Sequence, residues 1–191
     1  MRLDLVVGPN GAGKSTFVEL LLAPQRPGVT FVNADVLAAQ RWPQDPQAHS
    51  YEAAQLAAQT RARLIELREP FLAETVFSHP SKLDLVDLAI AAGYTVSVHA
   101  LLVPVELSVH RVTHRVAAGG HAVPEEKVRT RYDRLWPLVT EAISRATSAH
   151  VWDNSRHDGP REVALFAGGM PIGPCAWPGW TPEVLTSRWP G

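Results

Sequence analysis

The chain is poor in cysteine, lacks long apolar runs and has almost no net charge. A single cysteine, Cys175, excludes an internal disulfide framework and favours a reducing cytoplasm, where we expect the protein to act. No apolar run reaches the length of a membrane span and no secretory leader is apparent, so we expect no membrane association. A net charge of −1 provides no broad field for a polyanion, which argues against nucleic acid as a partner.

One short motif stands out from this background, the run Gly-Pro-Asn-Gly-Ala-Gly-Lys-Ser-Thr at residues 8–16. It matches G-x-x-x-x-G-K-[ST], the loop that surrounds the phosphates of a bound nucleotide. Residues 3–7 before it predict a buried strand, and residues 16–22 after it predict a helix. This strand–loop–helix context is the one that the motif requires, and it disfavours a merely glycine-rich turn.

The chemistry of the motif predicts nucleotide binding. Its glycines let several main-chain N–H groups converge on one anion, and the following helix adds the positive end of its dipole. The lysine can reach the β- and γ-phosphates, the serine hydroxyl can ligate Mg²⁺, and the threonine lies nearer the α-phosphate. We therefore expect ATP or GTP with Mg²⁺, held by Gly8, Pro9, Asn10, Gly11, Ala12, Gly13, Lys14, Ser15 and Thr16.

Strand-like and helix-like segments alternate along the chain, which predicts an α/β fold with a mainly parallel sheet and helices on both faces. Together with the phosphate loop, this pattern indicates a P-loop NTPase or kinase domain over residues 1–167. The Pro- and Trp-rich residues 168–191 are expected to pack on the same domain. Predicted strands are 3–7, 29–32, 70–76, 96–103 and 150–153, and predicted helices are 16–22, a short one from 35, 47–68, 81–92, 105–118 and 125–146.

Two carboxylates follow predicted strands, at the edge where ligands of open α/β sheets bind. Asp35 is either a base that accepts the proton of an attacking hydroxyl and holds Mg²⁺ through water, or a cap for a helix that starts at Val36. Glu74 and Thr75 end the next strand, near the phosphates or the acceptor, unless Glu74 is a surface residue. Asn33 either binds a ligand or stabilises the turn.

Arginines predict a lid over the phosphates. Arg111 and Arg115 are four residues apart and share one helix face before a glycine pair and His121. They either clamp the transferred phosphate or form a solvated basic face. Arg131, on the next helix, presents the same choice. Asn154 follows the last predicted strand and either contacts the adenine or forms an Asx turn.

The ordered set of motifs resembles the zeta-toxin group of P-loop kinases over residues 1–167. The resemblance implies transfer of the ATP γ-phosphate to the 3′-hydroxyl of the amino sugar in UDP-N-acetylglucosamine, and an antitoxin as a protein partner. It also implies that Asp35 is the base and that the lid arginines meet the γ-phosphate, with His121 in place of an arginine of the founding toxins. The motifs are Gly8–Thr16, Val32–Asp35, Glu74–Thr75, Gly93–Tyr94, Arg111–Val116, Gly119–His121, Val123–Pro124, Arg131–Tyr132 and Asp153–Ser155.

The sequence thus favours a kinase that acts on a small-molecule hydroxyl, with a nucleoside, an antibiotic or an RNA end as alternative acceptors. A nucleotide-dependent switch or binding module is the alternative of another class. The strand at 96–103 ends in Pro-Val-Glu and lacks the acid of an ordinary Walker B strand, which argues against a motor or transport ATPase. Asp35 separates the readings, because a switch needs no base facing an acceptor.

Overall fold

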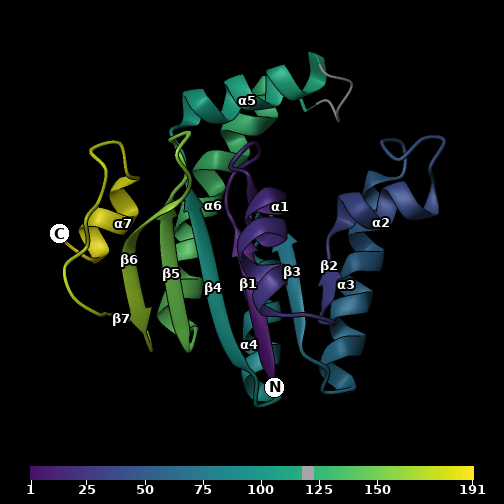
Figure 1. Cartoon of the computed structure of the whole chain (residues 1–191), viewed down its shortest axis with the longest axis horizontal. Helices are drawn as coiled ribbons and strands as arrows, with labels where there is room; N and C mark the ends of the chain where they lie inside the picture. The colour runs from purple at the N-terminus through teal and green to yellow at the C-terminus, as the bar shows by residue number, and fades with distance from the viewer. Residues whose placement is uncertain (118–122) are drawn as a thin grey trace.

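The computed structural model describes residues 1–117 and 123–191, which form a twisted sheet with the order β2-β3-β1-β4-β5-β6-β7 (Figure 1). The first five strands in this order are parallel, and β6 and β7 are antiparallel additions at one edge. The predicted mainly parallel α/β architecture is confirmed. The strands are β1 (Arg2–Val7), β2 (Thr30–Val32), β3 (Phe71–Thr75), β4 (Thr95–Leu102), β5 (Ser148–Asp153), β6 (Arg161–Ala167) and β7 (Met170–Pro171).

Most helices follow the predicted segments closely, but α7 in the C-terminal segment was not predicted, and the first helix differs from its prediction. The predicted helix at 16–22 begins earlier, at Lys14, and changes after Phe17 into a π-helical turn, Val18–Leu22. Among the described residues, no helix has the length and apolar character needed to cross a membrane. The first helix, Lys14–Phe17, is α1. The remaining helices are α2 (Ala34–Arg41), α3 (Ser50–Glu66), α4 (Ser81–Ala91), α5 (Val105–Ala117), α6 (Glu125–Arg145) and α7 (Glu183–Arg188).

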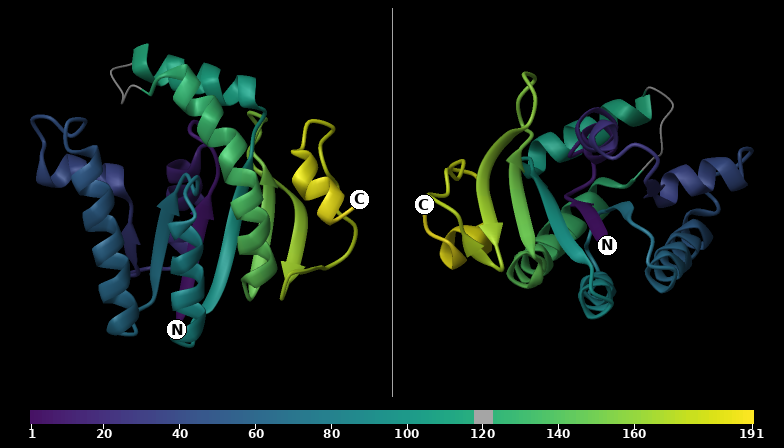
Figure 2. Two further views of the ribbon diagram at one scale, coloured as in Figure 1. Left: turned by 180° about the vertical axis from the view of Figure 1, so that it is seen from behind. Right: turned by 60° about the horizontal axis from the view of Figure 1, so that its bottom comes forward.

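Side chains of β1 point alternately to the two faces of the sheet, and each face has its own hydrophobic core. Leu3, Leu5 and Val7 belong to the larger core, which also holds side chains of α3, α4 and α6. Val6 points the other way and packs with Phe17 and the π-helical turn that follows it. Because successive side chains of a strand point to opposite faces, a central strand buried on both faces must be apolar throughout, apart from Asp4. Figure 2 shows α1 on one face of the sheet and α3, α4 and α6 on the other.

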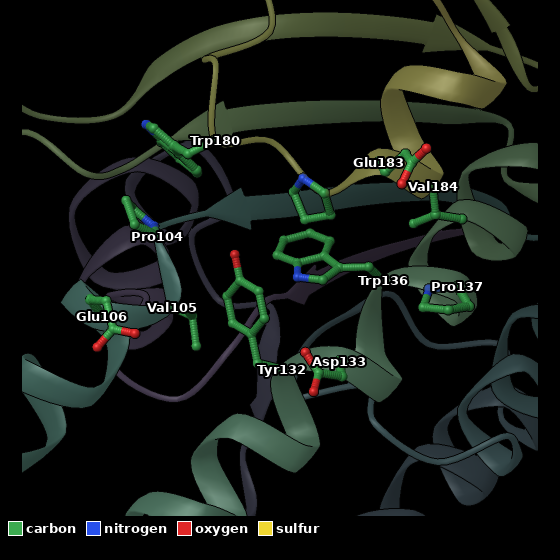
Figure 3. A pocket seen from close by; sticks show the side chains of 11 residues that line it. Pro104, Val105, Glu106, Tyr132, Asp133, Trp136, Pro137, Trp180, Glu183 and Val184 are labelled. Carbon is green, nitrogen blue, oxygen red and sulfur yellow. The ribbon is translucent and has the colours of Figure 1, made fainter.

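The segment after β6 packs on the outer part of the sheet and on α6. The ring of Trp189 lies 4.6 Å from that of Phe166, and the Trp177 indole N–H donates to the Trp189 carbonyl at 2.7 Å. Trp180 and Trp136 of α6 line a shallow pocket of about 470 Å³ between this segment and the helix (Figure 3). Sequence analysis did not predict β6 and β7, because a short edge hairpin lacks the helix-connected pattern of the parallel strands.

A buried carboxylate on β1 collects several cationic partners. Asp4 is 2% exposed, accepts hydrogen bonds from Arg2 at 2.6 and 2.9 Å, and lies 3.3 Å from both Arg26 Nε and His99 Nε2. Burial raises the pKa of Asp4, but the hydrogen bonds from His99 and Arg2 outweigh it, and the pKa falls far below the ordinary value. This carboxylate therefore joins the β1 and β4 strands to the segment after the π-helical turn.

Asp4→Asn is expected to lower the free energy of unfolding at neutral pH by about 1.5–3 kcal/mol, because the buried carboxylate loses its charge-assisted hydrogen bonds with Arg2, Arg26 and His99. Since the folded-state pKa of Asp4 is depressed, its contribution is present at neutral pH and declines as the pH falls below about 4. Urea unfolding at several pH values measures both effects. Asp158→Asn, at an exposed ion pair with Arg156, is the control and should leave the unfolding midpoint unchanged. Equal midpoints for all three proteins at pH 7 would contradict the prediction.

Candidate nucleotide-binding and acceptor site

The loop after β1 is closely enclosed by three other elements. Gly11 and Gly13 adopt positive φ angles of 73° and 81°. A Cβ atom at Gly11 would lie 2.8 Å from the Ser108 carbonyl oxygen of α5, and one at Gly13 would lie 2.7 Å from Asn154 Nδ2. Glycine is therefore required here both by conformation and by space. The loop also receives a hydrogen bond from the Ser108 hydroxyl to the Asn10 carbonyl.

Lys14 crosses the mouth of this loop at the start of α1. Its side chain is 7% exposed, and its Nζ donates to the Pro9 carbonyl at 3.0 Å and lies 3.9 Å from Glu74 Oε1. Burial lowers the pKa of Lys14, the negative charges of Glu74 and Asp35 oppose this shift, and Arg115 and Arg131 add to it. The ammonium group is thus held inside the cleft among both acids and both arginines, where a phosphate chain would pass.

Glu74 is the hub of the site. Its Oε2 accepts hydrogen bonds from the Ser15 hydroxyl at 2.8 Å and from Asn33 Nδ2 at 2.6 Å, while its Oε1 faces Lys14. The side chain is 10% exposed, so it does not lie on the outer surface. A serine hydroxyl beside a carboxylate is an all-oxygen donor set of the kind that Mg²⁺ prefers.

The end of β2 presents Asp35 to the same cleft. Asn33, not Asp35, caps α2: its Oδ1 accepts from the main-chain N–H groups of Asp35 at 2.7 Å and Val36 at 3.2 Å. The cap that the sequence allowed for Asp35 therefore belongs to the residue two positions earlier. The exposed Asp35 carboxylate lines the cleft together with Thr75, whose hydroxyl accepts from the Phe77 N–H at 3.4 Å.

Arg111 and Asn154 support the phosphate loop from α5 and from the end of β5. The Arg111 guanidinium donates to the carbonyls of Asn154 at 3.0 Å and Gly11 at 3.4 Å, and Asn154 Nδ2 donates to the Ala12 carbonyl at 2.7 Å. The Asx turn considered for Asn154 is formed one residue earlier, where Asp153 Oδ1 accepts from the Ser155 N–H at 2.9 Å. In this state Arg111 contacts main-chain oxygens around the loop.

Arg115 lines the cleft from α5, which lies across the carboxyl ends of the strands (Figure 1), and Arg131 lines it from the N-terminal part of α6. Their positive charges act on Lys14, which places them near the phosphate loop. The predicted site residue His121 lies outside the described residues. Asn10 and Thr16 also line the cleft, whereas the Pro9 carbonyl faces Lys14.

The cleft has a volume of about 740 Å³ and extends beyond the nucleotide loop to α3 and α4. Sequence analysis missed two cations in this part, Arg61 and Lys82. The signal that points to Arg61 is its spacing behind Ala54 and Ala57, since positions i, i+3 and i+7 share one helix face. Because Ala54 and Ala57 are small, the helix face that they share with Arg61 leaves room for a ligand beside the guanidinium.

Comparison with known proteins agrees with this geometry. A family model described as an AAA domain, AAA_33, matches residues 3–138. The chain belongs to the AAA_33 family. No curated protein matches the sequence of this AAA_33 member.

Solved structures show the same fold at low sequence identity. A chain of the AvrRxo1-ORF1:ORF2 complex with ATP is 17% identical, with a TM-score of 0.71 over 90% of this chain and 60% of its own length. A chain of the PezAT toxin–antitoxin system of Streptococcus pneumoniae is 15% identical, with a TM-score of 0.61 over 98% of this chain and 83% of its own. A chain of the Pnkp1/Rnl/Hen1 RNA repair complex is 20% identical, with a TM-score of 0.58 over 73% and 45%.

These likenesses confirm the predicted zeta-toxin-like P-loop fold. The AAA_33 chain spans only 60% of the length of the AvrRxo1 chain that it matches, so the larger protein contains parts that this chain does not reproduce.

Gly11→Ala is expected to weaken binding of a non-hydrolysable ATP analogue by at least about tenfold, because the new Cβ would meet the Ser108 carbonyl and push the loop out of place. Gly28→Ala is the matched control, with a similar φ of 77° and no atom within 4 Å of the new Cβ. It should cost about 1 kcal/mol of stability and leave nucleotide affinity unchanged. Calorimetric titration measures the affinities, and equal losses in both variants would contradict the explanation.

Proposed function

We propose that the protein is an ATP-dependent phosphotransferase that moves the γ-phosphate to a hydroxyl of a small molecule, with UDP-N-acetylglucosamine as the acceptor. The observation that carries this proposal is the position of Asp35. Its carboxylate lines the same cleft as Lys14 and Ser15 and acts electrostatically on Lys14, while Asn33 takes over the capping of α2. A carboxylate so placed can accept the proton that an attacking hydroxyl loses.

The remaining residues divide the work between phosphate and proton. Main-chain N–H groups of residues 8–16 bind the phosphate chain, and Lys14 neutralises its terminal oxygens. Mg²⁺, when bound, supplies charge neutralisation between the β- and γ-phosphates, and Ser15 would hold it with Glu74 and, through water, Asp35. Arg115 and Arg131 lie where they can stabilise the charge of the transferred phosphoryl group. Arg111 keeps the loop in position.

The choice of acceptor rests on the zeta-toxin-like motifs, and the fold likeness to the PezAT chain supports it. Two of the fold neighbours come from assemblies of two different proteins, AvrRxo1-ORF1:ORF2 and PezAT, which supports a protein partner for this chain as part of the same proposal. A nucleotide-dependent switch would need the phosphate loop but not the acid across the cleft from it.

Asp35→Asn is expected to lower kcat for transfer to UDP-N-acetylglucosamine by about 100-fold or more, because the proton acceptor is lost. The affinity for ATP should change much less, because Asp35 would hold Mg²⁺ only through water. ADP release with and without the acceptor measures the effect, and Asp84→Asn on the exposed side of α4 is the matched control. Acceptor-independent ADP release that the substitution leaves untouched would favour the switch instead.

Lys14→Ala is expected to abolish phosphate transfer and to weaken nucleotide binding while the fold is retained, since Glu74 keeps its hydrogen bonds from Ser15 and Asn33 when the ammonium group is removed. Circular dichroism and thermal unfolding report on the fold, and calorimetry with an ATP analogue reports on binding. Normal transfer by this variant would show that the phosphate site has been assigned to the wrong residues.

A further inference from the structure

Within the part of the chain that the structure describes, one buried arginine of the cleft has no counter-charge. Arg61 lies near the C-terminal end of α3, is 6% exposed and lines the cleft. Among the described residues, no hydrogen bond or ion pair to the Arg61 side chain is found. Burial lowers the pKa of Arg61, and no neighbouring carboxylate opposes that shift. A buried guanidinium without a counter-charge lowers the stability of the fold, so we look for an anionic ligand that would pair with it.

The helix around Arg61 leaves room for such a ligand. Ala54 and Ala57 line the cleft on the same helix face, one and two turns before the arginine. Larger side chains at these positions would fill the space above Arg61. Arg61 therefore lines a part of the cleft where the small side chains of Ala54 and Ala57 leave room.

A second cation completes the hollow from α4. Lys82 is half-buried and also lines the cleft, and no carboxylate among the described residues pairs with it. Burial lowers the pKa of Lys82, and the positive charge of Arg61 lowers it further, which shows that the two cations are close. Two like charges held together from different helices repel each other unless an anion lies between them.

This pair is separate from the charges around the phosphate loop. The groups that act on Lys14 are Glu74, Asp35, Arg115 and Arg131, whereas the charge that acts on Lys82 is Arg61. Seven Lys or Arg side chains and two carboxylates line the described part of the cleft, although the chain as a whole has a net charge of −1. Arg111 contacts the main chain of the loop, and Lys127 lies on α6 with Arg131. Arg61 and Lys82 are therefore the two lining cations that α3 and α4 contribute, and they are available for a second anion.

The connection between β3 and α4 supports the pair. Phe77 is fully buried with a φ of 64°, a conformation that bulky residues rarely adopt. This turn brings Ser78 and His79 to the cleft wall just before Lys82. Strained backbone of this kind is retained where the surrounding structure over-determines it, often at ligand sites.

We propose that Arg61 and Lys82 form a binding site for a phosphate group of the acceptor, away from the hydroxyl that reacts. The proposal rests on the proposed phosphotransferase function and deepens it: Arg61 and Lys82 bind the phosphate-bearing part of an acceptor such as UDP-N-acetylglucosamine, and a neutral sugar lacks this contact. An arginine and a lysine that line the same cleft from two helices suit a multiply charged phosphate group better than a planar carboxylate.

Arg61→Met tests the site, because methionine keeps an apolar stem and removes the charge. With Mg²⁺ and the non-hydrolysable analogue AMP-PNP filling the phosphate loop, wild type is expected to bind inorganic pyrophosphate by calorimetry, and the variant to bind it at least about tenfold more weakly. The affinity for AMP-PNP should stay within about twofold. Arg63→Met is the matched control, since Arg63 is on the same helix, exposed and paired with Glu66.

Thermal unfolding distinguishes a binding role from a structural one. Removal of an unpaired buried charge should leave the Tm of Arg61→Met equal to or above that of wild type, and pyrophosphate should raise the Tm of wild type but not of the variant. Arg61→Lys should restore part of the response. A variant that unfolds at a lower temperature and still responds to pyrophosphate would overturn the proposal.

A kinetic comparison ties the site to the acceptor. Arg61→Met should raise KM for UDP-N-acetylglucosamine and leave KM for ATP unchanged, whereas any transfer to neutral N-acetylglucosamine should be the same in both proteins. Pyrophosphate affinity unchanged by the substitution, or a stronger response to acetate than to phosphate, would overturn the phosphate site while the phosphotransferase function stands. Failure of wild type to bind AMP-PNP would instead overturn the phosphotransferase function. The site at Arg61 and Lys82 can still be tested in that case, by titrating pyrophosphate into the Lys14→Ala variant, which lacks the lysine of the phosphate loop.

Discussion

The site depends on one partly enclosed carboxylate, Glu74 of β3. It accepts from the Ser15 hydroxyl of α1 and from the Asn33 amide before α2, and it faces the ammonium of Lys14. Three segments far apart in sequence thereby meet at the carboxyl edge of the sheet. Because a carboxylate with little access to water must be paired, this contact constrains the phosphate loop, the start of α2 and the end of β3 to one arrangement.

That arrangement also separates the roles of two neighbouring residues. Asn33 donates its amide to Glu74 and uses its carbonyl oxygen to cap α2, which leaves the Asp35 carboxylate on the first turn facing the cleft. An amide can do both because it carries donor and acceptor atoms, whereas a carboxylate at position 33 would repel Glu74. Asp35, which we propose as the base, therefore does not cap α2, because Asn33 does so.

The charges of the cleft divide into two groups, one at the phosphate loop and one between α3 and α4. Net charge conceals this, since acidic residues elsewhere balance the total. Arg111 illustrates what spacing alone does not reveal: its separation from Arg115 predicts a shared helix face, whereas the contacts of its guanidinium with the carbonyls of Gly11 and Asn154 depend on other elements. A helix face is periodic, but the partners on that face come from other elements.

Sequence alone determined the phosphate loop, the parallel α/β fold and the approximate limits of most helices and strands, because these follow from local glycine chemistry and from hydrophobic periodicity. It also pointed to Asp35 and Glu74, since one follows a predicted strand and the other ends one. Tertiary structure decided the hub around Glu74, the capping role of Asn33, the edge strands β6 and β7, and the unpaired Arg61. These features depend on contacts between side chains that are far apart in the sequence. A local sequence pattern does not determine which charges such contacts bury or pair.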